Sequence, residues 1–257
     1  MQGGLNELSG LVASPSGAPI LWGHNDSGDS ARLFAISTAD GTNIGEVKLT
    51  GANNDDWEDI SSYRTNDGRN RLVIADTGDN DAKRNEVYLW VLDEPSANAK
   101  SAVADRVTIR FAEGPHDVET LFVDQAAGEV VLIGKRFGSS HAVPVHAFAL
   151  ADLQAGGVVT PAVIGPWTVP AGEPLGPTGG DVSADGQLLA LRLPFRMFIW
   201  KREPGVAFSR TLVAGNEALC RMVLGSGQLE SAAFLPDRRL VTGSEGDGTP
   251  LVASAPL

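Results

Sequence analysis

Short apolar runs alternate with clusters of Asp, Asn, Gly and Ser along the whole chain. Runs of this length, bounded by turn residues, predict many short β-strands joined by tight turns. The 30 glycines and 15 prolines suit such turns, and no pattern of a long amphipathic helix interrupts them. We therefore expect an all-β fold.

The strands repeat. An acidic strand opening, first seen as Glu-Leu-Ser-Gly-Leu at residues 7–11, recurs at intervals of 49 to 61 residues. The other copies are Asp-Trp-Glu-Asp-Ile at 56–60, Asp-Val-Glu-Thr-Leu at 117–121, Thr-Gly-Gly-Asp-Val at 178–182 and Gln-Leu-Glu-Ser-Ala at 228–232. A period near this length is typical of propeller blades.

Two further alignments support the repeat. Turn-forming segments follow the next apolar strand at 26–30, 76–80 and 244–248, and Tyr-Leu-Trp at 88–90 matches Phe-Ile-Trp at 198–200. Together they predict a single β-propeller domain over residues 1–257, with five blades of four antiparallel strands. The blades are expected to start near residues 7, 56, 117, 178 and 228.

The last blade has only 30 residues, enough for about three strands. We weigh two ways of completing it. Residues 1–6 add a short outer strand and tie the ends together, or the native chain has a longer N-terminus.

Composition and charge disfavour several classes of binding partner. The 20 Lys and Arg residues against 32 Asp and Glu residues give a net charge of -12, which disfavours binding to nucleic acid or to an anionic membrane. No apolar run reaches the length of a membrane span, and the first residues do not resemble a signal peptide. One cysteine permits neither an intramolecular disulfide nor a Cys-based zinc site. We expect a monomer that acts on a small molecule.

Candidate chemistry follows from the register of the inner strands. Alternate residues of a strand share a face, and inner strands line the channel, so the first and third positions of each opening converge on the axis. Several carboxylates this close cannot all be ionised without a cation. Oxygen ligands, with no cysteine and no His pair at ligand spacing, indicate Ca²⁺. The expected metal ligands are Glu7, Asp56, Glu58, Asp117, Glu119 and Glu230.

A second interpretation stays open: the acids sit at strand ends, accept hydrogen bonds from backbone N–H groups and stabilise the blade junctions. Around them we expect an outer ring from the ends of the second strands. Its members are His24, Asn25, Asp26, Asp76, Asp79, Lys135, Arg136, Arg192, Ser244 and Glu245. Lys135 and Arg192 either orient an anionic substrate oxygen or neutralise the acids.

His24 and His116 adjoin the acidic segments and are general-base candidates, although a lone His is more often structural. His141 and His146 fit packing or surface positions. Trp57 fits blade-to-blade packing better than a pocket wall. The sequence has no nucleophile elbow, Walker-type loop or Rossmann glycine fingerprint.

The openings at 7–11, 56–60 and 117–121, with Trp-Gly-His-Asn-Asp-Ser-Gly at 22–28 and Asp-Thr-Gly-Asp-Asn at 76–80, resemble a family of bacterial, often exported propeller proteins. The resemblance implies a secreted or periplasmic protein. In blade four, Gly179 and Gly180 replace the acidic opening, a departure from the symmetric site.

More distantly, the chain is similar to the calcium-dependent hydrolase propellers: paraoxonase, diisopropylfluorophosphatase, gluconolactonase and β-propeller phytase. That likeness implies an axial Ca²⁺. It favours a hydrolase of phosphotriesters, lactones or simple esters, with Asp56, Asp117 or His24 activating water and Lys135 and Arg192 nearby. The alternative is a non-catalytic platform for a protein, glycan or peptide, with a structural metal in the channel.

Overall fold

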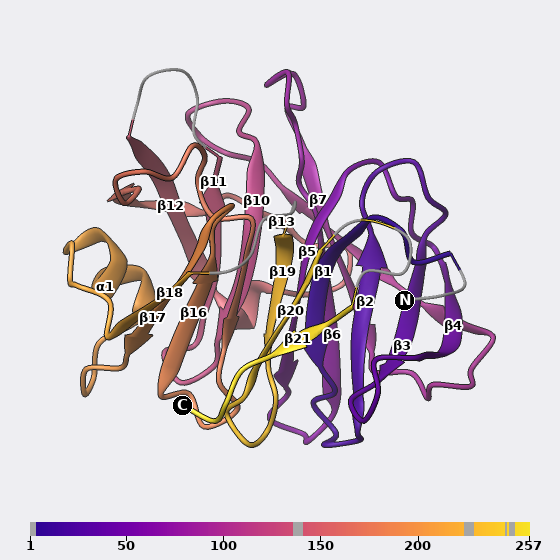
Figure 1. Cartoon of the computed structure of the whole chain (residues 1–257). Helices are drawn as coiled ribbons and strands as arrows, with labels where there is room; N and C mark the ends of the chain where they lie inside the picture. Colours follow the sequence, from indigo (N-terminus) through magenta and orange to yellow (C-terminus); the bar gives the residue numbers. More distant parts are fainter. Residues whose placement is uncertain (1–3, 136–140, 224–228, 245, 247–249) are drawn as a thin grey trace.

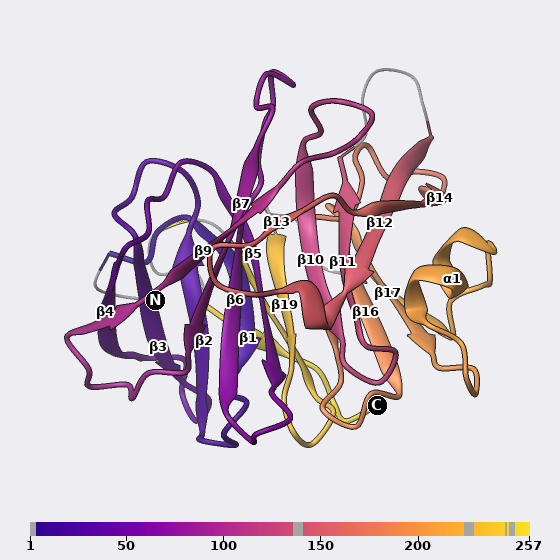
Figure 2. The same ribbon diagram turned by 180° about the vertical axis from the view of Figure 1, so that it is seen from behind.

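The computed structural model describes residues 4–135, 141–223, 229–244, 246 and 250–257. Within them, five β-sheets stand around a common axis, so the predicted five-bladed β-propeller is confirmed (Figures 1 and 2). The described part of the chain contains no helix with the length and apolar character that a bilayer span requires.

The first two blades are five-stranded. Blade one contains β1 (Leu8–Ala13), β2 (Ile20–Asn25), β3 (Arg32–Ser37), β4 (Asn43–Thr50) and β8 (Ser101–Val103). Blade two contains β5 (Trp57–Arg64), β6 (Asn70–Asp76), β7 (Val87–Asp93), β9 (Asp105–Ile109) and β13 (Val158–Val159). The fifth strand is parallel to the outer strand in each case and comes from the following blade's segment of the chain. It covers an edge that would otherwise expose unpaired backbone groups.

The remaining blades have four, four and three strands in the described residues. Blade three contains β10 (Val118–Asp124), β11 (Glu129–Gly134), β12 (Ala142–Ala149) and β14 (Ala162–Thr168), with a 3-10 turn, η1 (Leu150–Asp152), after β12. Blade four contains β15 (Gly179–Val182), β16 (Leu188–Arg192), β17 (Arg196–Lys201) and β18 (Cys220–Val223), with the short helix α1 (Phe208–Val213) packed outside against β14. Blade five contains β19 (Leu229–Phe234), β20 (Leu240–Ser244) and β21 (Val252–Ala253). The predicted four antiparallel strands are therefore present in blades one to four, with a parallel fifth strand added in blades one and two, and the described residues of blade five contain three.

The inner strands begin where the repeat predicts. β1, β5, β10 and β15 each start one residue after the first position of an acidic opening, and β19 starts at Leu229. The expected start at Gln228 lies just outside the described residues. The predicted second and third strands correspond to β2, β6, β20, β7 and β17.

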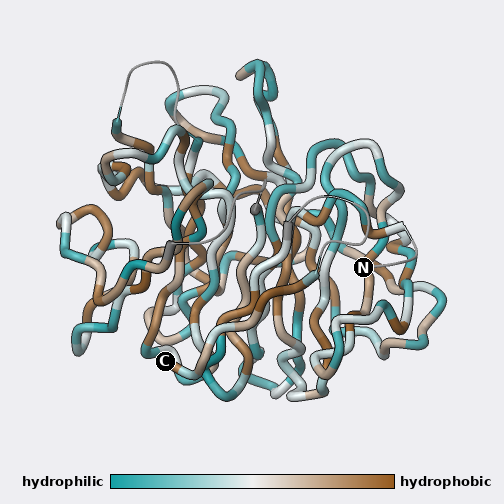
Figure 3. Tube along the Cα trace, viewed as in Figure 1, coloured by the Kyte–Doolittle hydropathy of each residue, from teal (hydrophilic) through white to brown (hydrophobic). Residues whose placement is uncertain are grey.

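Hydrophobic residues recur along the strands of the sheets (Figure 3), and the buried ones fill the space between the blades. Each of five buried clusters joins two neighbouring blades, because successive strand residues point to opposite faces of a sheet and so pack against different neighbours. Trp22 and Trp57 are fully buried between blades one and two. The packing role expected for Trp57 is confirmed.

The ring closes where β1 lies beside β19, as the indigo and yellow strands of Figure 1 show. Leu5 and Leu8 are buried there in one cluster with residues of blade five. Residues 4–6 form no outer strand, which corrects that expectation for the part of 1–6 that the structure describes. A hydrogen bond of 2.8 Å from the Gly246 N–H to the Asn6 carbonyl links the two ends instead.

Candidate metal centre

A β-bulge changes the course of the inner strand at the acidic opening in four blades. The pairing register shifts at the third position of the opening, occupied by Ser9, Glu58, Glu119 and Glu230. A bulge residue leaves the ladder, which lets the strand re-aim its side chain. β15 pairs with β16 without a shift. Blade four therefore lacks the bulge, and Gly180 occupies the third position of its opening in place of an acid.

Glycines allow blade four to approach its neighbours closely. A Cβ on Gly179 would lie 2.6 Å from the Glu230 carbonyl oxygen. A Cβ on Gly180 would lie 2.9 Å from the Thr120 methyl group. The departure from the repeat at these two residues therefore has a steric cause.

Five carboxylates from three blades gather at the opening. Oxygens of Asp26, Asp56 and Glu58 lie within 4.8 Å of one another, and so do oxygens of Glu58, Asp117 and Glu119. We call these five residues the acidic cluster. Glu58 belongs to both triads and connects them. Asp26, which the sequence places in the outer ring, is drawn in because β2 ends beside the start of β5.

Burial and mutual repulsion raise the pKa values of the acidic cluster. The pKa of Glu58 rises well above its usual value because the residue is buried and faces Glu119, Asp26 and Asp56. Burial also raises the pKa of Glu119 to about 7 and that of Asp56 to about 6, again with neighbouring carboxylates contributing. The cluster must therefore take up protons or a cation near neutral pH.

Lys135 neutralises part of this charge. Its Nζ lies 2.5 Å from Glu119 Oε1 and 3.8 Å from Asp117 Oδ2. Burial alone would lower the pKa of Lys135, but Glu119 and Asp117 raise it well above its usual value. Asp117 Oδ1 accepts a hydrogen bond of 2.8 Å from the Asp79 N–H, whereas its buried Oδ2 has no hydrogen-bond partner in the described structure.

Gly78 forms a wall of the cluster. A Cβ at this position would lie 2.1 Å from Glu58 Oε1 and 2.4 Å from Asp56 Oδ2, so the backbone here approaches both carboxylates closely. Arg84 holds this loop by donating to the Gly78 carbonyl at 2.8 Å and to Asp76 at 3.0 Å. The repeated Asp-Thr-Gly-Asp segment thus shapes the site.

Other acids of the inner strands hold the blades together. Asp59 is fully buried and accepts hydrogen bonds from the N–H groups of Ile60 (2.8 Å), Leu121 (3.0 Å) and Gly180 (3.1 Å), which belong to blades two, three and four. Asp181 accepts from Val182 at 2.9 Å within blade four and from Phe234 at 2.8 Å in blade five. The interpretation of acids as blade-junction acceptors therefore describes Asp59 and Asp181.

Three further candidates lie apart from the two triads. Within the described residues Glu230 belongs to neither triad, and its charge acts on Arg192. Arg192 is fully buried, and burial lowers its pKa to about 10 although Glu173 and Glu230 oppose the change. Glu7 is exposed, and its charge acts on Asp26. Arg136 and Glu245 of the expected outer ring lie outside the described residues.

His24 is enclosed behind the inner strand. The side chain has no exposed surface, and its ring meets Trp57 edge-on with centroids 5.3 Å apart. A Cβ on Gly10 would lie 2.2 Å from His24 Nε2, so the imidazole fills the space that this glycine leaves. Burial lowers the pKa of His24 to about 4.

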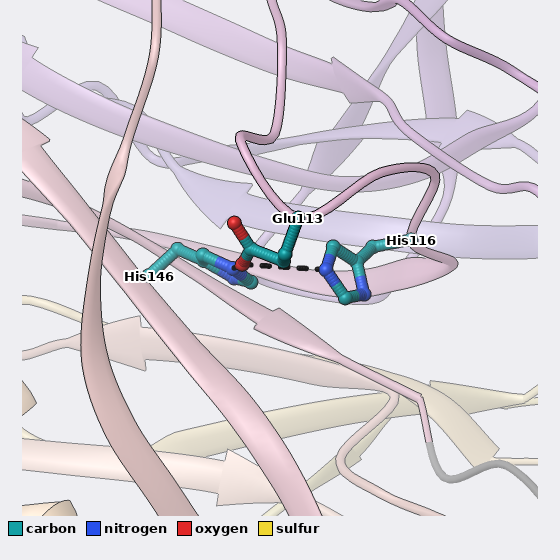
Figure 4. Close-up of side chains that lie close together, drawn as sticks. All are labelled: Glu113, His116 and His146. Carbon is teal, nitrogen blue, oxygen red and sulfur yellow. Dashed lines mark hydrogen bonds and ion pairs between the residues drawn. The ribbon is translucent and has the colours of Figure 1, made fainter.

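A second cluster contains histidines, contrary to the expectation that no His pair reaches ligand spacing. Ligand atoms of Glu113, His116 and His146 lie within 4.8 Å of one another (Figure 4). His116 and His146 are 30 residues apart, so sequence spacing could not show the pair. The only local signal is Glu113 three residues before His116. His146 is buried, as expected for packing, but it also makes a polar contact with Glu113.

The acidic cluster fits a hard divalent cation. All five side chains offer carboxylate oxygens, which is the donor set that Ca²⁺ takes in proteins. Asp117 Oδ2 is buried without a hydrogen bond, with Lys135 Nζ 3.8 Å away, and a bound cation would satisfy this acceptor. Lys135 leaves most of the negative charge uncompensated.

No protein-family model matches the sequence, and no curated protein matches it. Among solved structures, a chain of "Kuenenia stuttgartiensis Hydrazine Synthase" matches with a TM-score of 0.51 and 14% sequence identity. The alignment covers 99% of this chain and 97% of that chain. Such a distant match shows the fold alone. The protein is thus a β-propeller with an acidic site at the start of its inner strands, and the resemblance to hydrolase propellers stays an expectation.

Proposed function

We propose that this protein is a Ca²⁺-dependent hydrolase of phosphotriesters, lactones or simple esters, with its site at the acidic end of the channel. The observation that carries the proposal is the position of Glu58, a buried carboxylate shared by two acidic triads. A cation bound there relieves the repulsion among the carboxylates. A secreted or periplasmic location suits it, since extracellular modules bind Ca²⁺ at its higher concentration there.

Glu58, Asp117 and Glu119 would hold the ion, which supplies a Lewis acid for the reacting oxygen of the substrate. Asp56 is the best proton acceptor for water, because it is only partly buried and its pKa is raised to about 6 by burial and by Asp26. Lys135 carries a positive charge beside Glu119 and stabilises negative charge on the attacked group.

Two residues expected at the reaction centre take supporting roles in this proposal. His24 has no exposed surface, so we assign proton acceptance to Asp56 instead. Arg192 is buried and interacts with Glu230 and Glu173, so we assign it a stabilising role in blade four.

The proposal is tested with chromogenic phosphotriester, lactone and carboxyl-ester substrates, each assayed with Ca²⁺ and with chelator. We expect slow hydrolysis of at least one substrate class, lost in chelator and restored by Ca²⁺. Glu58→Gln and Glu119→Gln should abolish turnover together with Ca²⁺ binding. Asp56→Asn should lower the rate at least about 100-fold, the usual size of a general-base contribution, and leave Ca²⁺ bound.

Glu217→Gln is the matched control, because Glu217 is exposed on blade four, away from the acidic cluster. It should retain full activity. Absence of chelator-sensitive turnover on all three substrate classes would contradict the hydrolase proposal. Retained Ca²⁺ binding would then favour a non-catalytic binding platform with a structural channel ion.

A further inference from the structure

The second polar cluster joins a loop to a central strand of blade three. Glu113 and His116 lie in the segment between β9 and β10, and His146 projects from β12 (Figure 4). Glu113 Oε1 contacts His146 Nε2 and lies 3.3 Å from His116 Nε2. The two imidazole rings are 5.1 Å apart between centroids. Two ring nitrogens thus converge on one carboxylate oxygen.

His146 lies at an irregularity in the pairing of β12 with β14. The register of β12 and β14 shifts between Val145 and His146, so a bulge lies beside the histidine in a strand that is otherwise apolar here. His146 has no exposed surface, and its Nδ1 has no hydrogen-bond partner in the described structure. His116 Nε2 is also buried without a hydrogen bond. Glu113 Oε1 lies 3.3 Å from this His116 nitrogen, and a ligand bound between the two atoms would satisfy the buried nitrogen.

Phe111 holds both rings. It meets His116 edge-on at 5.1 Å and His146 at 4.7 Å between centroids. The Glu113 side chain remains 34% exposed and the His116 side chain 22% exposed. The cluster is therefore closed at His146, which is buried, and open to solvent at Glu113 and His116.

We propose that Glu113, His116 and His146 bind a divalent transition-metal ion of the Zn²⁺ class, at a site separate from the acidic cluster. Two imidazoles and one carboxylate are a donor set that zinc sites use with a fourth position left for water or substrate. The nitrogen donors exclude Ca²⁺ as the preferred occupant, because Ca²⁺ takes oxygen ligands. A metal ion would replace the direct contact between Glu113 and the histidines.

This assignment divides the ions between two sites. The acidic cluster offers only oxygen to a hard cation, and the histidine cluster offers nitrogen to a softer one. His116 directly precedes Asp117, so the same loop enters both sites. Each site can therefore be removed by a substitution that leaves the other site's ligands in place.

The test uses the full chain without a histidine tag, with Co²⁺ absorption in the visible range and Zn²⁺ calorimetry. We expect one Zn²⁺ per chain, and Co²⁺ bands that Zn²⁺ removes by competition. His116→Ala and Glu113→Gln should weaken Zn²⁺ binding at least about 100-fold, since even outer partners of metal ligands contribute about 10- to 100-fold. His146→Asn should do the same, with folding checked by circular dichroism.

His141→Ala is the matched control, because His141 is exposed and lies outside the cluster. It should bind Zn²⁺ as the wild type does, and so should Glu58→Gln, which removes an acid of the other site. If the wild type binds no Zn²⁺, or if His116→Ala and Glu113→Gln bind it unchanged, the proposal is overturned. The three residues are then a hydrogen-bonded tie between the loop and β12.

Discussion

Neighbouring acids of one strand opening play opposite roles. Glu58 and Asp59 are adjacent, both buried, and both have pKa values raised well above the usual range by burial. Glu58 faces other carboxylates, whereas three backbone N–H groups donate to Asp59. The first environment calls for a proton or a cation, and the second already satisfies the carboxylate. Composition alone could not separate them, because the difference lies in which groups of other blades they face.

Replacing Glu58 by Gln should therefore stabilise the protein in chelator and abolish its response to Ca²⁺. The substitution removes one charge from a group of five carboxylates and keeps the shape of the side chain. We expect the free energy of unfolding to rise by about 1 to 2 kcal/mol at pH 8 in chelator, the scale of one pKa unit of repulsion. Guanidinium denaturation with and without Ca²⁺ measures both effects. Glu217→Gln should change neither, and a large loss of stability in Glu58→Gln would show that Glu58 is structural.

The inner strand is the part of each blade that the sequence shows best. The acidic opening of the inner strand is a local sequence pattern, and so are the turn after the second strand and the aromatic residues of the third strand. These patterns predicted the starts of β1, β5, β10 and β15 to within one residue. The bulges at Glu58 and Glu119 were not predictable, because a bulge is defined by pairing with another strand. The parallel edge strands β8 and β13 were missed for a related reason. They are only three and two residues long and pair with a different blade.

The same limit explains the incomplete prediction of the sites. Repeat register brought Asp56, Glu58, Asp117 and Glu119 together correctly. It also included Glu230, which belongs to neither triad in the described residues; blade four, between blades three and five, has no bulge, and Gly180 occupies the third position of its opening. The contact of Glu113 with His146 depends on a loop crossing to β12, which no periodic pattern encodes.

Asp59 links the inner strands of three blades by hydrogen bonds, and its contribution to the free energy of unfolding can be measured. Asp59→Ala leaves the N–H groups of Leu121 and Gly180 without their acceptor inside the protein. Each such loss costs about 1 to 3 kcal/mol, so we expect destabilisation by about 2 to 6 kcal/mol in urea denaturation. The rise in melting temperature with Ca²⁺ should persist, because Asp59 is outside the acidic cluster. Asp105→Ala, at the exposed start of β9, should change stability by less than about 0.5 kcal/mol.

Negative charge in the propeller is concentrated where the blades converge. The chain carries a net charge of -12, and five of its acids meet in one cluster with Lys135 as the cation bonded to it. Apolar clusters between all neighbouring blades provide the stability that offsets this repulsion. The stability of the whole propeller should then depend on pH and on divalent cations.

We predict that, in chelator, the propeller loses stability as the pH rises from about 4 to about 7. Burial raises the pKa of Glu119 to about 7, that of Asp181 to about 7 and that of Asp56 to about 6. In the unfolded chain these groups lose their protons near their usual values, so the folded state binds more protons in this window and its stability falls with pH. His24 and His146 act in the opposite direction, because burial lowers both pKa values, that of His24 to about 4, but these two groups are fewer than the buried acids. We expect a net loss on the order of 3 kcal/mol between pH 5 and 8.

Saturating Ca²⁺ should flatten the dependence of stability on pH by favouring the ionised acidic cluster, and Glu119→Gln should reduce the loss in chelator. Guanidinium denaturation at several pH values measures the slope, and a rise in stability from pH 5 to 8 in chelator would contradict the charge arrangement that the structure shows.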